Sequence, residues 1–393
     1  MRHCIVLIIL GLFAVVHLQS AAAAPLSSTD YLTVQGEKII TASGNEVLLR
    51  GTNIGGWLVQ ESWMSPTNAQ CQLEAMDVLD LRFGRDKRKE LMALYDDHFI
   101  TETDLDFLKD MGITVLRLPF WYRTLADEQG ALLPDAFSRM DRFVTQCKKR
   151  GLYVILDLHG APGSQNGKDH SGDVSGANLF ESKVYMDQTV ALWETVAAHY
   201  KDNPAIAMYD LLNEPLGQEG ATTRTQWDFY DRLYKAIRAV DANHIITLES
   251  CWEAANLPHP KEYGWQNVVY QYHAYKWGAD NDAAMQTAFA KAKILSIQKA
   301  NYGVPTLIGE FTVFQNIKAW DQVLAAYNEA GFHWTTWSYK VKGPGSTWGI
   351  QNMPDLSVDI HTSTEAEIRA IWGNPKAATV NQPVYDVIKK HLP

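Results

Sequence analysis

The chain has 393 residues, of which 46% are hydrophobic and 20% charged, a composition typical of a globular protein that excludes a disordered or low-complexity chain. The formal net charge of −10 at pH 7 argues against nucleic acid or an anionic membrane surface as a partner, and it favours a neutral one. The length is ample for one large domain.

The first residues have the pattern of an export signal. Arg2 and His3 precede an apolar run over 5–18, and small residues follow at which a signal peptidase could cut. The apolar run is shorter than the roughly 20 residues that span a bilayer, which disfavours a membrane anchor. We expect residues 1–24 to be a signal peptide and residues 25–393 to form one secreted domain, extracellular or, in a bacterium, periplasmic.

The segment 31–40 predicts a pair of short strands that turns near Gly36, a hairpin suited to closing the bottom of a barrel. Beyond it, β-branched and apolar runs alternate with helical patterns, as in a parallel sheet with crossover helices. The clearest helices are expected at 101–111, 137–150, 182–200, 225–240 and 282–300. Strands are expected at 47–55, 113–119, 152–158, 205–212, 245–250, 267–273, 305–310 and 332–338.

Eight strands separated by helical patterns predict an α/β fold, a closed (β/α)₈ barrel of one domain. The rival is an open doubly wound sheet, but the first strand is not followed by a Gly-x-Gly-x-x-Gly loop. The sequence shows no linker, internal repeat or second domain, and the segment 69–88 carries no motif that we can place.

Polar and aromatic residues stand after most of the expected strands. Because the carboxyl ends of parallel barrel strands meet at one rim, these side chains should converge there. Each has an ordinary interpretation as a loop or core residue, but their convergence favours a catalytic site. In strand order they are Glu61, Arg117, His159 with Asn166, Asn213 with Glu214, His273 with Tyr275, Glu310 and Trp337.

Two carboxyl groups facing each other across the barrel mouth can cleave a glycosidic bond. One must carry a proton for the leaving oxygen, and the other, about 5 Å away, must be ionised to attack the anomeric carbon. We assign Glu214 as the acid/base and Glu310 as the nucleophile. Arg117 and Tyr275 are expected to orient Glu310, and Asn213 to bind the sugar 2-hydroxyl. Glu214, for which the sequence offers no such partner, should have a raised pKa.

The strings NIGGWLVQESWMSP, LRLPFWY, DLHGAPGSQNG, LLNEP and LIGEF resemble family 5 glycoside hydrolases, most closely the exo-β-1,3-glucanases. The resemblance covers residues 49–311 and implies a (β/α)₈ fold, retention of configuration, no cofactor and a β-glucan substrate. It also implies that Glu61 and Asn166 bind the terminal sugar. The residues implied to wall the −1 subsite are Arg117, His159, Asn213, His273, Tyr275 and Trp337.

The stretch after His273 and the region of the eighth strand depart from the glucanase pattern. An endo-acting β-glucanase, cellulase or mannanase is therefore the alternative, and a carbohydrate-binding barrel without activity is a third hypothesis. A carbohydrate-binding barrel of this kind would bind glucan without turning over any activated aryl β-glycoside.

Several other residues have weaker assignments. Glu249 and Glu253 are expected to bind substrate hydroxyls or to stabilise their loop, and His170 and His333 are taken as structural.

No cysteine or histidine spacing indicates a metal site, and we expect a monomer. Three cysteines outside the signal allow at most one disulfide: Cys71, Cys147 and Cys251. Of six tryptophans near strand ends, two or three should line the cleft: Trp57, Trp63, Trp121, Trp252, Trp277 and Trp348.

Overall fold

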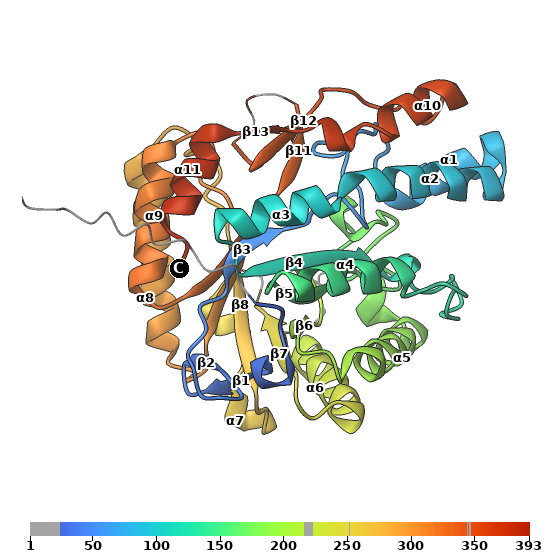
Figure 1. Ribbon diagram of the computed structural model, residues 1–393. Coiled ribbons are helices and arrows are strands. Elements are labelled where there is room, and N and C mark those ends of the chain that lie inside the picture. The colour runs from blue at the N-terminus through green and yellow to red at the C-terminus, as the bar shows by residue number, and fades with distance from the viewer. Residues whose placement is uncertain (1–23, 216–222, 251, 344, 346) are drawn as a thin grey trace, which may run out of the picture.

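The computed structural model describes residues 24–215, 223–250, 252–343, 345 and 347–393 (Figure 1). The expected signal peptide lies outside the described residues except for Ala24, and Cys251 lies outside them as well. Among the described residues, none of the helices is long and apolar enough to cross a membrane.

Eight parallel strands close into a barrel, in the order β10-β3-β4-β5-β6-β7-β8-β9. This confirms the predicted (β/α)₈ fold, although the strand ends differ from the expected ones by a few residues. The strands are β3 (Arg50–Asn53), β4 (Val115–Trp121), β5 (Tyr153–Gly160), β6 (Ile206–Asp210), β7 (Ile245–Glu249), β8 (Val268–Ala274), β9 (Thr306–Phe311) and β10 (His333–Thr336).

Helices cover the outside of the barrel, so the strands are buried on both faces and read as nearly continuous apolar runs (Figure 1). The capping of α3 shows how the sequence sets their ends. Thr101 and Asp104 form a capping box at its start, and Gly112 ends it with a φ of 101°. The predicted helices are α3 (Glu102–Met111), α4 (Ser138–Lys149), α5 (Lys183–Tyr200), α6 (Thr223–Val240) and α8 (Ala283–Ala300).

The segment 69–88, for which the sequence suggested no structure, contributes to a helix pair, α1 (Gln72–Phe83) and α2 (Arg85–Phe99), joined at Gly84. Gly84 has a φ of 83°, which a residue with a Cβ rarely adopts. The remaining elements are α7 (Pro260–Tyr263), α9 (Ile317–Glu329), α10 (Glu365–Trp372), α11 (Gln382–Lys390), β11 (Lys340–Lys342), β12 (Gln351–Met353), β13 (Thr379–Val380) and the 3₁₀ helices η1 (Ser28–Asp30), η2 (Tyr122–Thr124), η3 (Asp169–Ser171), η4 (Leu179–Glu181), η5 (Ala254–Asn256) and η6 (Pro375–Ala377).

The predicted N-terminal hairpin is present as β1 (Leu32–Gln35) and β2 (Lys38–Thr41), which pair antiparallel. Leu32 and Ile39 pack against the inward residues of the barrel strands, among them Met208 and Ile245. An apolar layer therefore closes the amino-terminal end of the barrel, and the carboxyl end is left for the site.

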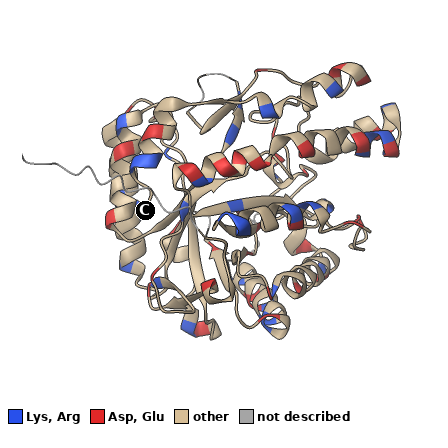
Figure 2. Cartoon of the chain, in the orientation of Figure 1, with Lys and Arg blue, Asp and Glu red and all other residues tan. Residues whose placement is uncertain are grey.

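Charged residues of both signs are interspersed along the outer helices (Figure 2). Several of them form ion pairs between neighbouring turns, such as Lys183 with Asp187 at 2.6 Å and Lys235 with Asp231 at 2.6 Å. Pairs as exposed as these contribute little to stability.

Candidate active site

A pocket of about 580 Å³ opens at the carboxyl end of the barrel. Three of the expected site residues, Arg117, Asn166 and His273, lie behind its surface, and the others line it. The expected residues that line the pocket are Glu61, His159, Asn213, Glu214, Tyr275, Glu310 and Trp337.

Glu310, at the end of β9, accepts hydrogen bonds from two directions. Nη1 of Arg117 lies 2.7 Å from Oε1, and the Tyr275 hydroxyl lies 2.9 Å from Oε2. Both contacts were expected from the sequence. A guanidinium on one oxygen and a hydroxyl on the other keep the carboxylate in one orientation.

Arg117 is itself fully buried and has more than one carboxylate partner. Nε lies 2.8 Å from Asp210 and Nη2 lies 3.1 Å from Asp157, while Nη2 also donates to Oδ1 of Asn213 at 2.9 Å. Burial acts to lower the pKa of Arg117, but Asp157, Asp210 and Glu310 outweigh it and raise the pKa, so the guanidinium keeps its charge. The hydrogen bond from Nη2 of Arg117 also holds the side chain of Asn213 in place.

Glu214 follows β6 and lies in a different environment. Its Oε1 is 2.7 Å from Nδ1 of His273, and its Oε2 is 3.5 Å from Nε2 of His170. The expectation that Glu214 has no side-chain partner is therefore wrong, because β8 and the loop after β5 bring the two imidazoles to it. Burial nevertheless raises the pKa of Glu214, while His170 and Arg117 act to lower it.

The His273 ring indicates where the acidic proton of Glu214 sits. Burial lowers the pKa of His273 to about 3, so the ring is neutral and carries one N–H. Nε2 has no hydrogen-bond partner among the described residues, and an unpaired buried N–H is costly. The proton therefore belongs on Nδ1, which donates to Oε1 of Glu214. When Glu214 is protonated, its proton lies on Oε2.

The two carboxyl groups are close together. Nδ1 of His273 lies 2.7 Å from Oε1 of Glu214 and 3.5 Å from Oε2 of Glu310. The separation of those two oxygens cannot exceed the sum of these distances. The two carboxyl groups therefore flank one imidazole nitrogen at the same end of the pocket.

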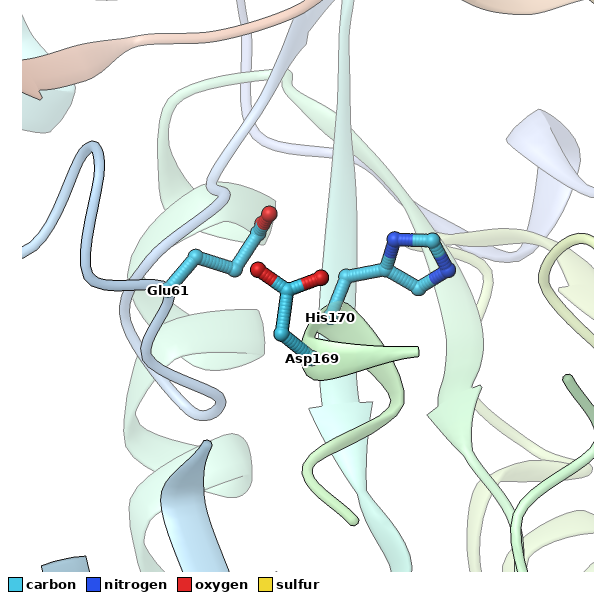
Figure 3. Close-up of side chains that lie close together, drawn as sticks. All are labelled: Glu61, Asp169 and His170. Carbon is cyan, nitrogen blue, oxygen red and sulfur yellow. The ribbon is translucent and has the colours of Figure 1, made fainter. Parts of the chain in front are cut away.

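A second polar cluster of the pocket joins two loops. Figure 3 shows the carboxylates of Glu61 and Asp169 turned toward one another, with the ring of His170 beside Asp169. Burial raises the pKa of Glu61 to about 8, and Asp169 adds to the shift. One of the Glu61 oxygens accepts the Trp63 indole N–H at 2.8 Å, and the other has no partner among the described residues. That second oxygen is itself buried.

Carboxylate and imidazole groups this close could in principle hold a metal ion, since their ligand atoms lie within 4.8 Å of one another. The hydrogen bonds of Asn166 argue otherwise. Its Oδ1 accepts the Lys168 N–H at 2.9 Å, so its Nδ2 donates to Nε2 of His170 at 2.8 Å. The neutral ring then carries its proton on Nδ1, and the cluster offers a donor and two carboxyl groups instead of three metal ligands.

His170, predicted to be structural, lines the pocket instead. Its position three residues after Gly167 in the loop that carries Asn166 was the available signal. His333 is buried on β10 and accepts the Leu49 N–H through Nδ1, in agreement with a structural role. Cys71 and Cys147 are buried free thiols.

Tryptophans form the outer part of the pocket. Trp63 and Trp348 pack edge to face with ring centres 5.0 Å apart, and Trp277 lies 5.8 Å from Trp348. Trp277 is 63% exposed, and Tyr275, which stacks on it, donates its hydroxyl to Glu310. With Trp252, these make four of the six tryptophans considered, more than expected, whereas Trp57 and Trp121 are buried elsewhere.

A (β/α)₈ barrel with two adjacent carboxyl groups, one near a guanidinium and one near neutral imidazoles, defines a glycoside hydrolase site. Comparison with known proteins agrees. Residues 83–343 match the family described as Cellulase (glycosyl hydrolase family 5). This chain belongs to glycoside hydrolase family 5.

Two curated relatives illustrate the similarity. A beta-xylosidase of Phanerodontia chrysosporium is 30% identical over 92% of this chain and 83% of its own length. A glucan 1,3-beta-glucosidase of Blumeria graminis is 29% identical over 74% of this chain and 70% of its own. Among solved structures, rutinosidase from Aspergillus niger has a TM-score of 0.63 at 16% identity, with 83% of this chain and 98% of that chain covered. The structural likeness shows the shared fold.

Proposed function

We propose that this chain is a secreted, retaining β-glycoside hydrolase that releases glucose from the non-reducing ends of β-1,3-glucan. Glu310 attacks the anomeric carbon and forms a covalent glycosyl-enzyme, while Glu214 gives its proton to the departing oxygen. Glu214 then removes a proton from the water that hydrolyses the intermediate. The observation that carries the proposal is the close pair of Glu214 and Glu310 in unlike surroundings.

The contacts of each carboxyl suit its proposed role. Glu310 receives the Arg117 donor on Oε1 and the Tyr275 donor on Oε2, and the two together fix the orientation of its carboxylate. Glu214 is buried beside neutral imidazoles, and its proton lies on Oε2, the oxygen that does not accept from His273. Burial that raises the pKa of Glu214 keeps that proton in place at weakly acidic pH.

Exo action is supported by the buried carboxyl group of Glu61, which is 5% exposed. With a pKa of about 8, Glu61 carries a proton near neutral pH, so it can both donate to and accept from sugar hydroxyls. Asp169 and His170 supply further polar atoms beside it. A set of such groups within the pocket suits the hydroxyls of a terminal sugar, whose far side carries no further glycosidic bond.

A time course of products from a soluble β-1,3-glucan, resolved by chain length, tests this proposal. Glucose alone from the earliest points, absent with Glu310→Ala, is the expected result. A ladder of oligosaccharides would instead establish the endo-acting alternative. Cleavage of β-1,4-glucan or mannan in place of β-1,3-glucan would discard the substrate and keep the catalytic pair.

A second candidate substrate is a β-xyloside, because the relative that covers 92% of this chain carries the name beta-xylosidase. Xylose lacks the hydroxymethyl group of glucose, so the two sugars differ at a single position that the pocket must fill or leave open. Values of kcat/KM for 4-nitrophenyl β-xyloside and β-glucoside decide between them. A clear preference for the xyloside would overturn the glucosidase assignment while leaving exo action intact.

A further inference from the structure

Glu249 ends β7, between β6 and β8, and is fully buried. It was expected to bind substrate hydroxyls or to stabilise its loop, and because it does not line the pocket, its position does not fit the first of these roles. Its carboxyl group lies behind Glu214 instead. The family assignment and the proposed reaction leave this buried acid without a role.

The carboxyl group of Glu249 holds the backbone of Glu214. Oε2 of Glu249 accepts the Glu214 N–H at 2.7 Å, and Nδ2 of Asn166 donates to the Glu214 carbonyl at 3.2 Å. Glu214 has a φ of 43°, in the left-handed region that residues with a side chain rarely adopt. A conformation of this kind persists where surrounding contacts enforce it, and these two hydrogen bonds do so.

Glu249 also stands beside the imidazole that holds the Glu214 side chain. Oε1 of Glu249 lies 3.4 Å from Nδ1 of His273, the atom that donates to Oε1 of Glu214. The Glu249 carbonyl in turn accepts the Tyr230 hydroxyl at 3.0 Å, which ties the end of β7 to α6. Glu249 therefore touches both the backbone of Glu214 and the ring that orients its carboxyl group.

We propose that Glu249 is a positioning residue for the acid/base: it fixes the Glu214 backbone in the left-handed conformation and, with His273, directs Oε2 of Glu214 toward the leaving-group oxygen. The inference rests on the proposed role of Glu214. Its consequence is that altering Glu249 impairs protonation of the leaving group while attack by Glu310 continues.

The surroundings of Glu249 indicate a neutral carboxyl group. Burial raises its pKa well above the ordinary value, and the charges of Glu214 and Asp210 add to the shift while Arg117 opposes it. His273, the other titratable group that faces it, is neutral. Glutamine reproduces a neutral carboxyl group and keeps an oxygen for the Glu214 N–H, so Glu249→Gln should retain the positioning.

The test measures kcat/KM for a series of aryl and alkyl β-glycosides with leaving groups from 2,4-dinitrophenol to methanol. Good leaving groups need no acid, so loss of positioning steepens the dependence on leaving-group pKa. For Glu249→Leu we expect a loss of about 100-fold on the methyl glycoside and less than about threefold on the dinitrophenyl glycoside. Glu249→Gln should stay within a few-fold of the wild type throughout, with the alkaline limb of its pH profile unmoved.

Glu253, which the sequence predicted to bind substrate hydroxyls or to stabilise its loop, is exposed and does not line the pocket. Glu253→Gln, in the loop that follows β7, is therefore the matched control. It should behave as the wild type. An equal loss of activity of Glu249→Leu on every substrate, or no loss on any, would overturn the positioning role. If Glu249→Leu fails to fold, Glu249→Asp tests the same point, because it withdraws the carboxyl group by one methylene and should also steepen the dependence.

Glu214→Ala is measured in parallel to separate the two proposals. A steep dependence for Glu214→Ala with a flat one for the Glu249 variants overturns the positioning role alone. A flat dependence for Glu214→Ala overturns the acid/base assignment and the positioning role with it. Steep dependences for Glu214→Ala and Glu249→Leu, with a wild-type slope for Glu249→Gln, support both.

Discussion

The two carboxyl groups of the site are chemically alike but have opposite environments. Glu310 lies against the buried cation Arg117 and the Tyr275 hydroxyl. Glu214 is buried, with the neutral ring of His273 against its carboxyl group and Glu249 against its N–H. Burial raises the pKa of Glu214, and two donors hold the carboxylate of Glu310 in place, so the surroundings of the two groups suit the proposed division between acid and nucleophile.

The largest effect is expected from removing the nucleophile. Glu310→Ala should lower kcat on every substrate by on the order of 10⁴-fold or more, because no covalent intermediate can form. The fold should survive, since Glu310 is at the rim of the barrel, and a thermal unfolding curve close to that of the wild type checks this. Retention of turnover on an aryl β-glycoside would remove Glu310 from its role.

Removing the acid should instead discriminate among substrates. Glu214→Ala should lower kcat/KM by about 10²–10⁴-fold on substrates with poor leaving groups and much less on dinitrophenyl glycosides. The comparison uses the same enzyme preparation with both classes of substrate. An equal loss on both would show that the two glutamates do not differ in the way their surroundings suggest.

Replacing Arg117 tests how far its charge stabilises the buried carboxyl groups around it. Arg117→Met leaves Asp157, Asp210 and Glu310 buried without a guanidinium, which should destabilise the fold by about 3–5 kcal/mol at pH 7. Burial raises the pKa values of Asp157 and Asp210 to about 7, so both carry protons at pH 5 and the loss should be smaller there. Urea unfolding at the two pH values measures the difference, and an equal loss at both would contradict the account.

A single hydrogen bond to Glu310 is a finer probe. Tyr275→Phe removes the donor at 2.9 Å from Oε2 and keeps the ring that stacks near Trp277 and Trp348. A hydrogen bond to a charged group contributes about 1.5–3 kcal/mol, so kcat/KM should fall by roughly 10- to 100-fold. Phe314 packs edge to face against Trp277 and Trp348, with ring centres 5.2 and 5.3 Å away, so Phe314→Leu alters the same aromatic group and serves as the control. A similar loss there would point to packing instead.

The smallest signal is in the pH profile of the unaltered enzyme. The proposed role of Glu214 requires its protonated form, and burial raises the pKa of that group. The alkaline limb of kcat/KM should therefore lie at a higher pH than the ordinary pKa of glutamate permits, with activity lost as the pH rises through the raised value. A limb at the ordinary value would contradict the effect of burial.

Much of the fold was predictable because its signals are local. The alternation of apolar strands and amphipathic helices follows from the periodicity of each segment, and so does the hairpin at Gly36. The pair α1 and α2 was missed although Leu91, Tyr95 and Phe99 recur at helical spacing, because the many charged residues before them hide the period. The order of the strands around the barrel placed the strand-end residues together, as predicted.

What the sequence by itself determined is the set of residues after the strands, among them Glu214, Glu310, Arg117 and Tyr275. Only the tertiary structure decided their finer environment. The approach of His170 and His273 to Glu214, and the bond from Glu249 to its N–H, join segments that are 35 to 59 residues apart. Such contacts depend on the register of neighbouring strands and the path of a loop, which no single segment encodes. Burial, which raises the pKa of Glu214, likewise arises only when the whole barrel has closed.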